Sequence, residues 1–274
     1  MSFPRSYFEE AVSVVAARAG FVPEIGVILG SGLGGFCDSI ESPVEILYEK
    51  IPGFLRATAS MHAGKLVLGT LCGKRIACLS GRFHHYEGYS YEQLCIPIRF
   101  LHCLGVKRTI LTNIAGAINP AYRPGDVMIL RDHIKLFGDS PLTGANDSEF
   151  GPRCPKMRNV YAPELRALAK DAALASPLTV HEGAYFFFPG PQFETAAEIR
   201  AAGLLGGDVA GMSTVPEAIA AAHCGMPILG LSLVVNMAEG VWDAPIENDA
   251  INAVLSDAGT FYSYLKDIIK RMEV

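Results

Sequence analysis

The sequence has few charged residues and no basic run. Only 19% of its 274 residues are Asp, Glu, Lys or Arg, and the formal net charge is −5. Without a stripe of Lys or Arg for a phosphodiester backbone, nucleic acid is not an expected partner. No apolar run reaches the roughly 18 residues of a membrane span. Because Arg5, Glu9, Glu10 and Arg18 also interrupt the N-terminal apolar residues, we expect no membrane segment, no signal peptide and a cytoplasmic location.

Patterns for metals and disulfides are also missing. The seven cysteines include no Cys-x-x-Cys pair, and an odd number does not complete a disulfide framework. The sequence contains no His-Glu-x-x-His motif and no Asp-rich calcium loop. It therefore predicts no metal site, and its cysteines favour a reducing compartment.

Half of the residues are hydrophobic, which is enough for a large core. Strands are predicted at Val27–Leu29, Leu66–Leu71, Ile76–Ser80, Thr109–Thr112, Val127–Leu130, Ala184–Phe188 and Ile228–Val235. Helices are predicted at Tyr91–Leu104, Ala162–Ala175, Ala196–Leu205, Val215–Cys224 and Asp249–Arg271. A long irregular loop is predicted at Phe137–Met157, because this segment is rich in Gly, Pro, Asp and Ser. No linker separates two cores, so we expect one α/β domain over residues 1–274, with a central mixed β-sheet flanked by helices.

A glycine-rich loop follows the first predicted strand. In Gly30–Gly35 the missing side chains let backbone N–H groups approach an anion, and Ser31 adds a hydroxyl. Open α/β sheets bind ligands at the carboxyl ends of their strands, so a phosphate site is one interpretation. The same residues fit Gly-x-Gly-x-x-Gly, a dinucleotide fingerprint, with Glu49 near the expected acidic spacing. A tight turn that binds nothing is the third interpretation.

A second polar cluster, Gly81–Gly88, follows the strand predicted at Ile76–Ser80. Arg82 supplies a planar fork suited to phosphate, and in an extended segment His84 and Tyr86 point the same way. Glu87 is placed to orient these basic groups. A solvated polar loop is the alternative.

The segment Gly190–Thr195 follows another apolar strand and leads into a helix. Phe193 is placed to stack on a base while Glu194 bonds the edge of that base, with Thr195 in the first helical turn. Glu194 is equally typical of a residue that caps a helix or compensates its dipole.

The segment Gly211–Glu217 also runs from a strand into a helix. Ser213 or Thr214 is predicted as the N-cap, with Pro216 in the first turn and Glu217 close behind. A helix N-terminus with a free hydroxyl also binds phosphate.

Together these motifs resemble, in order and in rough spacing, the trimeric purine nucleoside phosphorylases. They include His62–Gly64 (His-Ala-Gly), Thr112–Gly116 (Thr-Asn-x-Ala-Gly) and the strand-end Asn236, and the match covers nearly the whole chain. The resemblance implies a nucleoside phosphorylase-like fold, a homotrimer and phosphorolysis of 6-oxopurine (deoxy)ribonucleosides such as inosine and guanosine. The products are free purine and (deoxy)ribose 1-phosphate, inorganic phosphate is the co-substrate, and no cofactor is required.

The resemblance also implies residue roles. Phosphate is expected to bind Ser31, Arg82, His84, the backbone N–H of Ile114, Ser213 and His62, the last on a mobile flap. The nucleoside is expected to contact Tyr86, Ala115, Gly116, Phe188, Phe193, Glu194, Met212, Asn236 and Asn248. The catalytic roles fall to Asn236, Glu194 and His84. A dinucleotide-dependent oxidoreductase is disfavoured, because it leaves Arg82, Glu194 and Ser213 without a function.

Two positions depart from the family pattern. Cys154 stands where an aromatic residue usually reaches the neighbouring subunit's ribose site, and Asn248 stands about where many members carry a His near the ribose 5′-hydroxyl. Met237 after Asn236 is a form associated with bacterial-type branches, some of which accept xanthosine. The alternatives are a xanthosine-accepting variant, a methylthioadenosine phosphorylase, for which Asp is expected at position 236, and a nucleoside-binding protein without turnover.

Overall fold

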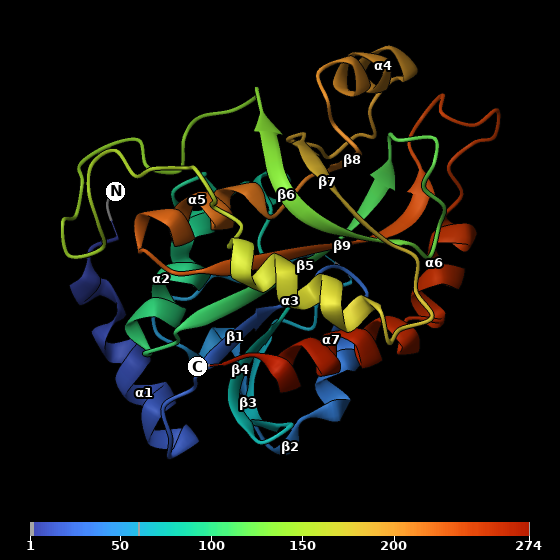
Figure 1. Ribbon diagram of the computed structural model, residues 1–274. Coiled ribbons are helices and arrows are strands. Elements are labelled where there is room, and N and C mark those ends of the chain that lie inside the picture. The colour runs from blue at the N-terminus through green and yellow to red at the C-terminus, as the bar shows by residue number, and fades with distance from the viewer. Residues whose placement is uncertain (1–2, 60, 274) are drawn as a thin grey trace.

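Nine β-strands form one mixed sheet in the computed structural model of the chain, which describes residues 3–59 and 61–273 (Figure 1). The strands are β1 (Ile25–Ile28), β2 (Glu41–Leu47), β3 (Lys65–Leu71), β4 (Lys74–Ser80), β5 (Arg108–Ala117), β6 (Val127–Lys135), β7 (Val180–Phe187), β8 (Val209–Gly211) and β9 (Ile228–Met237). Their order is β2-β3-β4-β1-β5-β8-β7-β6-β9, and β9 also pairs with β5. The half of the sheet from β5 to β9 therefore closes on itself, while the half from β2 to β1 stays open.

The middle of the sheet is parallel. Strand β1 pairs in parallel with β4 and β5, and β5 pairs in parallel with β9. All four residues of β1 are buried, as expected of a strand covered on both faces. Because the carboxyl ends of β1, β4, β5 and β9 meet at one edge, the polar segments that follow them are brought together there.

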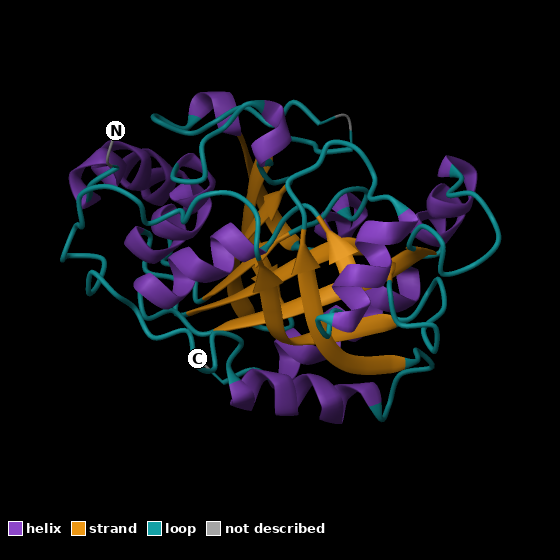
Figure 2. Ribbon diagram, turned by 90° about the horizontal axis from the view of Figure 1, so that it is seen from above, coloured by secondary structure: helices purple, strands orange, loops and turns teal. Residues whose placement is uncertain are grey.

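Helices cover both faces of the sheet (Figures 1 and 2). They are α1 (Glu9–Ala19), α2 (Ile96–Cys103), α3 (Pro163–Ala173), α4 (Ala196–Leu204), α5 (Val215–His223), α6 (Asn248–Ser256) and α7 (Gly259–Arg271). Helix α2 packs against α1 and α5, whereas α3 packs against α7. Helix α4 lies apart, beyond β7 and β8 (Figure 1). This α/β architecture confirms the predicted fold class.

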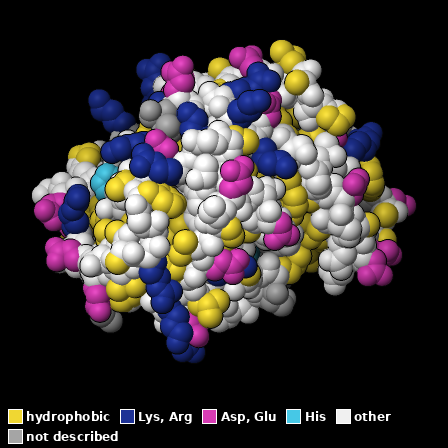
Figure 3. Space-filling view, turned by 90° about the horizontal axis from the view of Figure 1, so that it is seen from below, with side chains coloured by type: hydrophobic (Ala, Val, Ile, Leu, Met, Phe, Trp, Pro, Cys, Tyr) yellow, Lys and Arg dark blue, Asp and Glu magenta, His cyan; other side chains and the backbone are white. Residues whose placement is uncertain are grey.

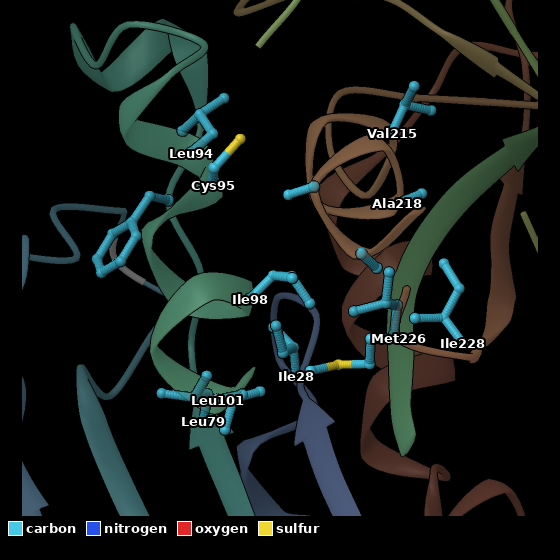
Figure 4. Packing of buried hydrophobic residues seen from close by; sticks show 14 of the residues in the cluster. Ile28, Leu79, Leu94, Cys95, Ile98, Leu101, Val215, Ala218, Met226 and Ile228 are labelled. Carbon is cyan, nitrogen blue, oxygen red and sulfur yellow. The ribbon is translucent and has the colours of Figure 1, made fainter. Parts of the chain in front are cut away.

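Two hydrophobic clusters lie on opposite sides of the sheet. On one side Ile28 packs with residues of α2 and α5 (Figure 4). On the other, Ile25 and Val27 pack in the cluster that contains Phe261 and Leu265 of α7. Alternate residues of β1 therefore face alternate layers, because successive strand side chains point to opposite faces.

Parts of the predicted secondary structure were wrong or missed. The helix predicted over Asp249–Arg271 is two helices, because Asp257 leaves the helical conformation (φ −99°, ψ 20°) and α7 restarts at Gly259. Helix α1 and strands β2 and β8 were not predicted. In β2 most residues are exposed and Pro43 interrupts the pattern, while β8 has only three residues. Such segments lack the hydrophobic periodicity that indicates a strand.

The predicted irregular loop is present between β6 and α3. Arg153 holds it through Nη1, which donates to the carbonyls of Leu142 (2.8 Å) and Gly144 (2.9 Å). Asn146 ties it to α5 through a 3.0 Å hydrogen bond with Nε2 of His223. Hydrogen bonds within the loop and to α5 therefore hold it in place.

The surface carries charges of both signs. On the face drawn in Figure 3, Lys and Arg side chains are interspersed with Asp and Glu and with hydrophobic and neutral atoms. Among the described helices, none is long and apolar enough to cross a membrane.

Candidate active site

A cavity of about 580 Å³ lies at the edge of the sheet where β1, β4, β5 and β9 end. Among the residues expected to bind phosphate or nucleoside, it is lined by Ser31, Arg82, His84, Tyr86, Ile114, Ala115, Gly116, Phe193, Glu194, Met212, Ser213, Asn236 and Asn248. His62 and Phe188 are the two expected residues that do not line it. Residues far apart in the sequence thus share one cavity.

The glycine-rich loop after β1 borders this cavity through Gly30 and Ser31. The Gly30 N–H donates to Oγ1 of Thr112 on β5 (3.1 Å), and Gly32 has a φ of +74°, a region that favours glycine. The loop continues into a 3₁₀-helix, Gly34–Ser39, instead of an α-helix. A dinucleotide fingerprint requires a strand–turn–α-helix context, so that interpretation is wrong.

Arg82 forms the buried basic group of the cavity, with 1% of its surface exposed. Its Nη1 donates to Oγ of Ser213 (3.0 Å) and to Oγ1 of Thr214 (3.1 Å). Its Nη2 is buried and has no hydrogen-bond partner. A planar guanidinium with an unused N–H pair is suited to a phosphate oxygen.

His84 borders the cavity beside Arg82 and is oriented by Glu87. Nδ1 of His84 lies 2.9 Å from Oε1 of Glu87, and the His84 backbone N–H donates to the same oxygen (2.8 Å). Burial acts to raise the pKa of Glu87, but hydrogen bonds from His84 and Thr58 outweigh it and lower the pKa to about 2. Glu87 is therefore a carboxylate that fixes the His84 ring, which also stacks on Tyr86 at 4.6 Å.

His62 does not line the cavity but contacts two residues that do. Its Nε2 is 3.2 Å from Oγ of Ser31, and its ring stacks on His84 at 5.3 Å. Burial and the neighbouring charges of His84 and Arg82 lower its pKa to about 3. A neutral His62 can therefore hold the hydroxyl of Ser31, which does line the cavity, in place.

The turn before α5 is not capped as the sequence suggests. Thr214 occupies the N-cap position, but its side chain makes no capping hydrogen bond. Its hydroxyl instead receives hydrogen bonds from Arg82 and from Nδ2 of Asn113 (2.9 Å). Thr214 has a φ of +68°, which is strained for a β-branched residue. The Thr214 hydroxyl therefore helps to hold Arg82 in place, and the strained backbone of Thr214 costs conformational free energy.

The end of β5 forms the floor of the cavity. Ile114, Ala115 and Gly116 line it, and the pairing of β5 with β9 shifts register between Ala115 and Gly116. A Cβ atom on Gly116 would lie 3.0 Å from Nδ2 of Asn236, so the glycine leaves room for that amide. Nδ2 of Asn236 donates to the Met237 carbonyl (2.8 Å), which leaves its second N–H available.

Glu194 lines the cavity from the segment between β7 and α4. Its Oε1 is buried without a hydrogen-bond partner, and burial raises its pKa. It does not cap α4, because Thr195 and Glu198 form the complete capping box. Thr195 is thus the N-cap and not a first-turn residue. Phe193, 55% exposed, forms the adjacent aromatic wall.

Phe188 and Cys154 do not line the main cavity. Phe188 is 6% exposed and stacks on Phe137 at 5.7 Å, where it lines a smaller neighbouring cavity that also contacts Glu194. The Phe188 ring therefore packs on another aromatic side chain beside the smaller cavity. Cys154 is exposed in a separate cavity of about 650 Å³ with His133 and Lys135.

Sequence reasoning missed several residues of the site. Asn113 and Thr214 were not assigned a binding role, and Met61, Ile246, Ile251 and Asn252 also line the cavity. The signal for Asn113 was present, because a polar residue inside an apolar strand has to be satisfied by a partner. No group of three or more His, Cys, Asp or Glu residues in the described part of the chain is arranged to hold a metal.

The chain matches the phosphorylase superfamily over residues 24–269. It is 45% identical to purine nucleoside phosphorylase 1 of Geobacillus stearothermophilus over 98% of both chains, and 43% identical to that of Bacillus subtilis over 97% of this chain and 98% of the relative. Among solved structures, Schistosoma mansoni purine nucleoside phosphorylase in complex with adenosine superposes with a TM-score of 0.94, at 36% identity and full coverage of both chains.

The fold, the cavity and these similarities define the class: the chain belongs to the phosphorylase superfamily. Its relatives along nearly the whole length are purine nucleoside phosphorylases. Within the superfamily, the chain is therefore a member of the purine nucleoside phosphorylase family, which confirms the resemblance predicted from its motifs.

Proposed function

We propose that the chain catalyses phosphorolysis of 6-oxopurine (deoxy)ribonucleosides such as inosine and guanosine. The products are free purine and (deoxy)ribose 1-phosphate, and inorganic phosphate is the co-substrate. Pentosyl transfer of this kind agrees with the family of the chain.

The observation that carries this proposal is that two sets of polar groups line one cavity. An unused guanidinium nitrogen of Arg82 and the hydroxyls of Ser31 and Ser213 suit an anion. A carboxylate oxygen of Glu194 without a hydrogen-bond partner and an amide N–H of Asn236 suit the edge of an oxopurine. A nucleoside whose base binds Glu194 and Asn236 then presents its anomeric carbon to a phosphate held by Arg82.

In the reaction a phosphate oxygen forms a bond to C1′ while the bond from C1′ to the purine breaks. The electron pair of the breaking bond goes to the purine, and positive charge develops on the sugar. Asn236 and Glu194 stabilise the departing base, and His84 and Arg82 hold the phosphate near C1′. Such preorganised contacts act by positioning and by stabilising charge that develops in the transition state, with no covalent intermediate on the enzyme.

The experiment measures phosphate-dependent base release from inosine, guanosine, xanthosine, adenosine and methylthioadenosine. We expect inosine and guanosine to have the highest kcat/KM. Preference for methylthioadenosine would reject the 6-oxopurine assignment, and no release with any nucleoside would reject turnover.

Glu194→Ala tests recognition of the base. We expect kcat/KM for inosine to fall about 10²–10³-fold, because the variant loses its acceptor for the base edge. Glu164→Ala, an exposed glutamate in the first turn of α3, is the matched control and is expected to keep wild-type activity. Wild-type kcat/KM in Glu194→Ala would contradict the proposed orientation of the base.

We also propose that the chain works as a homotrimer in the cytoplasm. The resemblance is to trimeric enzymes, and the exposed side chains of Leu136 (61%) and Phe137 (43%) at the end of β6 supply apolar surface for a neighbouring copy. Sedimentation equilibrium is expected to give three times the 29.4 kDa chain mass. A monomer at micromolar concentration would contradict the assembly.

A further inference from the structure

Arg82 has a buried carboxylate partner that does not line the cavity. Oε1 of Glu217, in the first turn of α5, lies 3.4 Å from Nε of Arg82. Glu217 is 3% exposed and Arg82 is 1% exposed, so both charges are withdrawn from water. Arg82 borders the cavity, whereas Glu217 does not. A buried charge requires a partner, and each of these two supplies one for the other.

Capping does not explain the position of Glu217. The sequence from Thr214 to Glu217 has the spacing of a capping box, in which the carboxylate accepts a hydrogen bond from the N-cap backbone N–H. The Thr214 side chain makes no such cap, and Oε2 of Glu217 is buried without a partner. At α4 the same spacing does form the complete box, between Thr195 and Glu198. Glu217 is therefore turned toward Arg82 instead of toward its own helix.

Only Nη1 of the guanidinium makes hydrogen bonds, to Ser213 and Thr214. Nε lies 3.4 Å from Oε1 of Glu217, an ion-pair contact without a hydrogen bond, and Nη2 has no hydrogen-bond partner. Because a guanidinium is planar and rigid, fixing its Nη1 and Nε sides also fixes the direction of Nη2. An anion that contacts Nη2 gains a charge-assisted hydrogen bond and removes an unsatisfied buried donor.

We propose that Glu217 is a positioning residue for phosphate. It holds the Arg82 guanidinium in the plane that leaves Nη2 for a phosphate oxygen, and it does not touch the substrate. This inference rests on the proposed function, in which Arg82 binds phosphate. The negative charge of Glu217 opposes phosphate binding, while its orienting effect favours it. Orientation dominates, because without Glu217 the guanidinium is held on its Nη1 side alone.

The test is Glu217→Gln, which keeps the size of the side chain and removes its charge. We expect KM for phosphate to rise about tenfold and KM for inosine to stay within about twofold, since only the phosphate-binding guanidinium is misplaced. A fall in the phosphate KM would show that charge repulsion dominates, and an unchanged value would show that Arg82 needs no partner. Either result, or equal rises in both KM values, would overturn the positioning role.

Glu164→Gln, in the first turn of α3, is the control for loss of an exposed helix N-terminal carboxylate and is expected to leave both KM values unchanged. In an Arg82→Ala background, Glu217→Gln is expected to change the phosphate KM no further, because the two residues act as a unit. Additive effects would mean that Glu217 acts independently of Arg82.

Should Glu217→Gln fail to fold, Glu217→Asp retains the charge but shortens its reach, and the same selective rise in the phosphate KM is expected. Equal rises in both KM values there would overturn the inference. Phosphate-dependent base release by the wild-type protein separates failure of the proposed function from failure of the role of Glu217. No base release by the wild-type protein rejects the proposed function, whereas wild-type turnover with an unchanged phosphate KM in the variants rejects only the role of Glu217.

Discussion

Gly30→Ala is expected to strain the contact between β1 and β5 at the cavity edge. A Cβ atom at Gly30 would lie 2.7 Å from the Asn113 Cα and 3.1 Å from the Thr112 carbonyl oxygen. Carbon atoms prefer a separation of about 3.5–4.0 Å, so the methyl group arrives roughly 1 Å too close. The obstacle is backbone of a central strand, which cannot turn aside as a flexible side chain does. The two strand ends must therefore move apart.

Overpacking of this kind costs about 1–3 kcal/mol of unfolding free energy. For a chain of this size that corresponds to a fall in Tm of roughly 2–12 °C, which leaves a folded protein to assay. Because Gly30 and Asn113 both line the cavity, the KM for phosphate is also expected to rise, by about tenfold. The measurements are urea unfolding, thermal unfolding and phosphate-dependent kinetics on the same preparation.

The matched control is Gly259→Ala at the first residue of α7. A Cβ atom there meets nothing within 4 Å, and alanine has the better helix propensity, so the change is expected to be neutral or slightly stabilising. Gly30→Ala with the stability and phosphate KM of the wild type would refute the reasoning, because it would show that β1 and β5 separate freely at this edge.

Two further predictions concern His62 and Thr195. The folded-state pKa of His62 is about 3, below its ordinary value of 6.5, so the unfolded chain takes up the proton first and stability falls as the pH drops from 6.5 toward 3. His62→Gln should reduce that fall by at most about 1.4 kcal/mol per pH unit in urea unfolding at pH 7, 5.5 and 4.5; equal falls in both proteins would refute this. Thr195→Ala removes the N-cap of α4 and should cost about 1 kcal/mol. It should raise the KM for nucleoside, through the adjacent Glu194, more than that for phosphate, and unchanged unfolding would contradict the cap.

The sequence predicted the cavity well because its polar motifs follow strand ends. Arg82 and Asn236 stand at the ends of apolar runs, and parallel pairing through β1 and β5 brings these two positions to one edge of the sheet. Such cavity residues are predictable from two things alone: the local sequence pattern and the rule that open α/β sheets bind ligands at the carboxyl ends of their strands. Glu194 follows β7, which runs antiparallel to β5 and β9, and it reaches the cavity on the segment before α4. The fold class was also predictable from local pattern, since buried strands alternate with helices along most of the chain.

Predictions from the sequence fail where a tertiary contact decides which of several local hydrogen-bond arrangements a side chain adopts. The sequence predicts that Ser213 or Thr214 caps α5, but the Thr214 hydroxyl accepts hydrogen bonds from Arg82 and Asn113 and makes no cap. Local pattern contains no information about which distant partner wins such a competition.

Strand β5 pairs with β1 before it in the chain and with β8 and β9 far after it. Thr109, for example, lies opposite Ile228. During synthesis, the ribosome must therefore release β9 before the floor of the cavity has both of its neighbouring strands. Contacts between such distant segments also slow folding. The entropy cost of closing a long loop is incurred before the contacts that offset it have formed. A nascent chain that stops short of β9 is expected to expose the apolar faces of β5 and to depend on chaperones, so the enzyme acquires its binding site only after β9 has been synthesised.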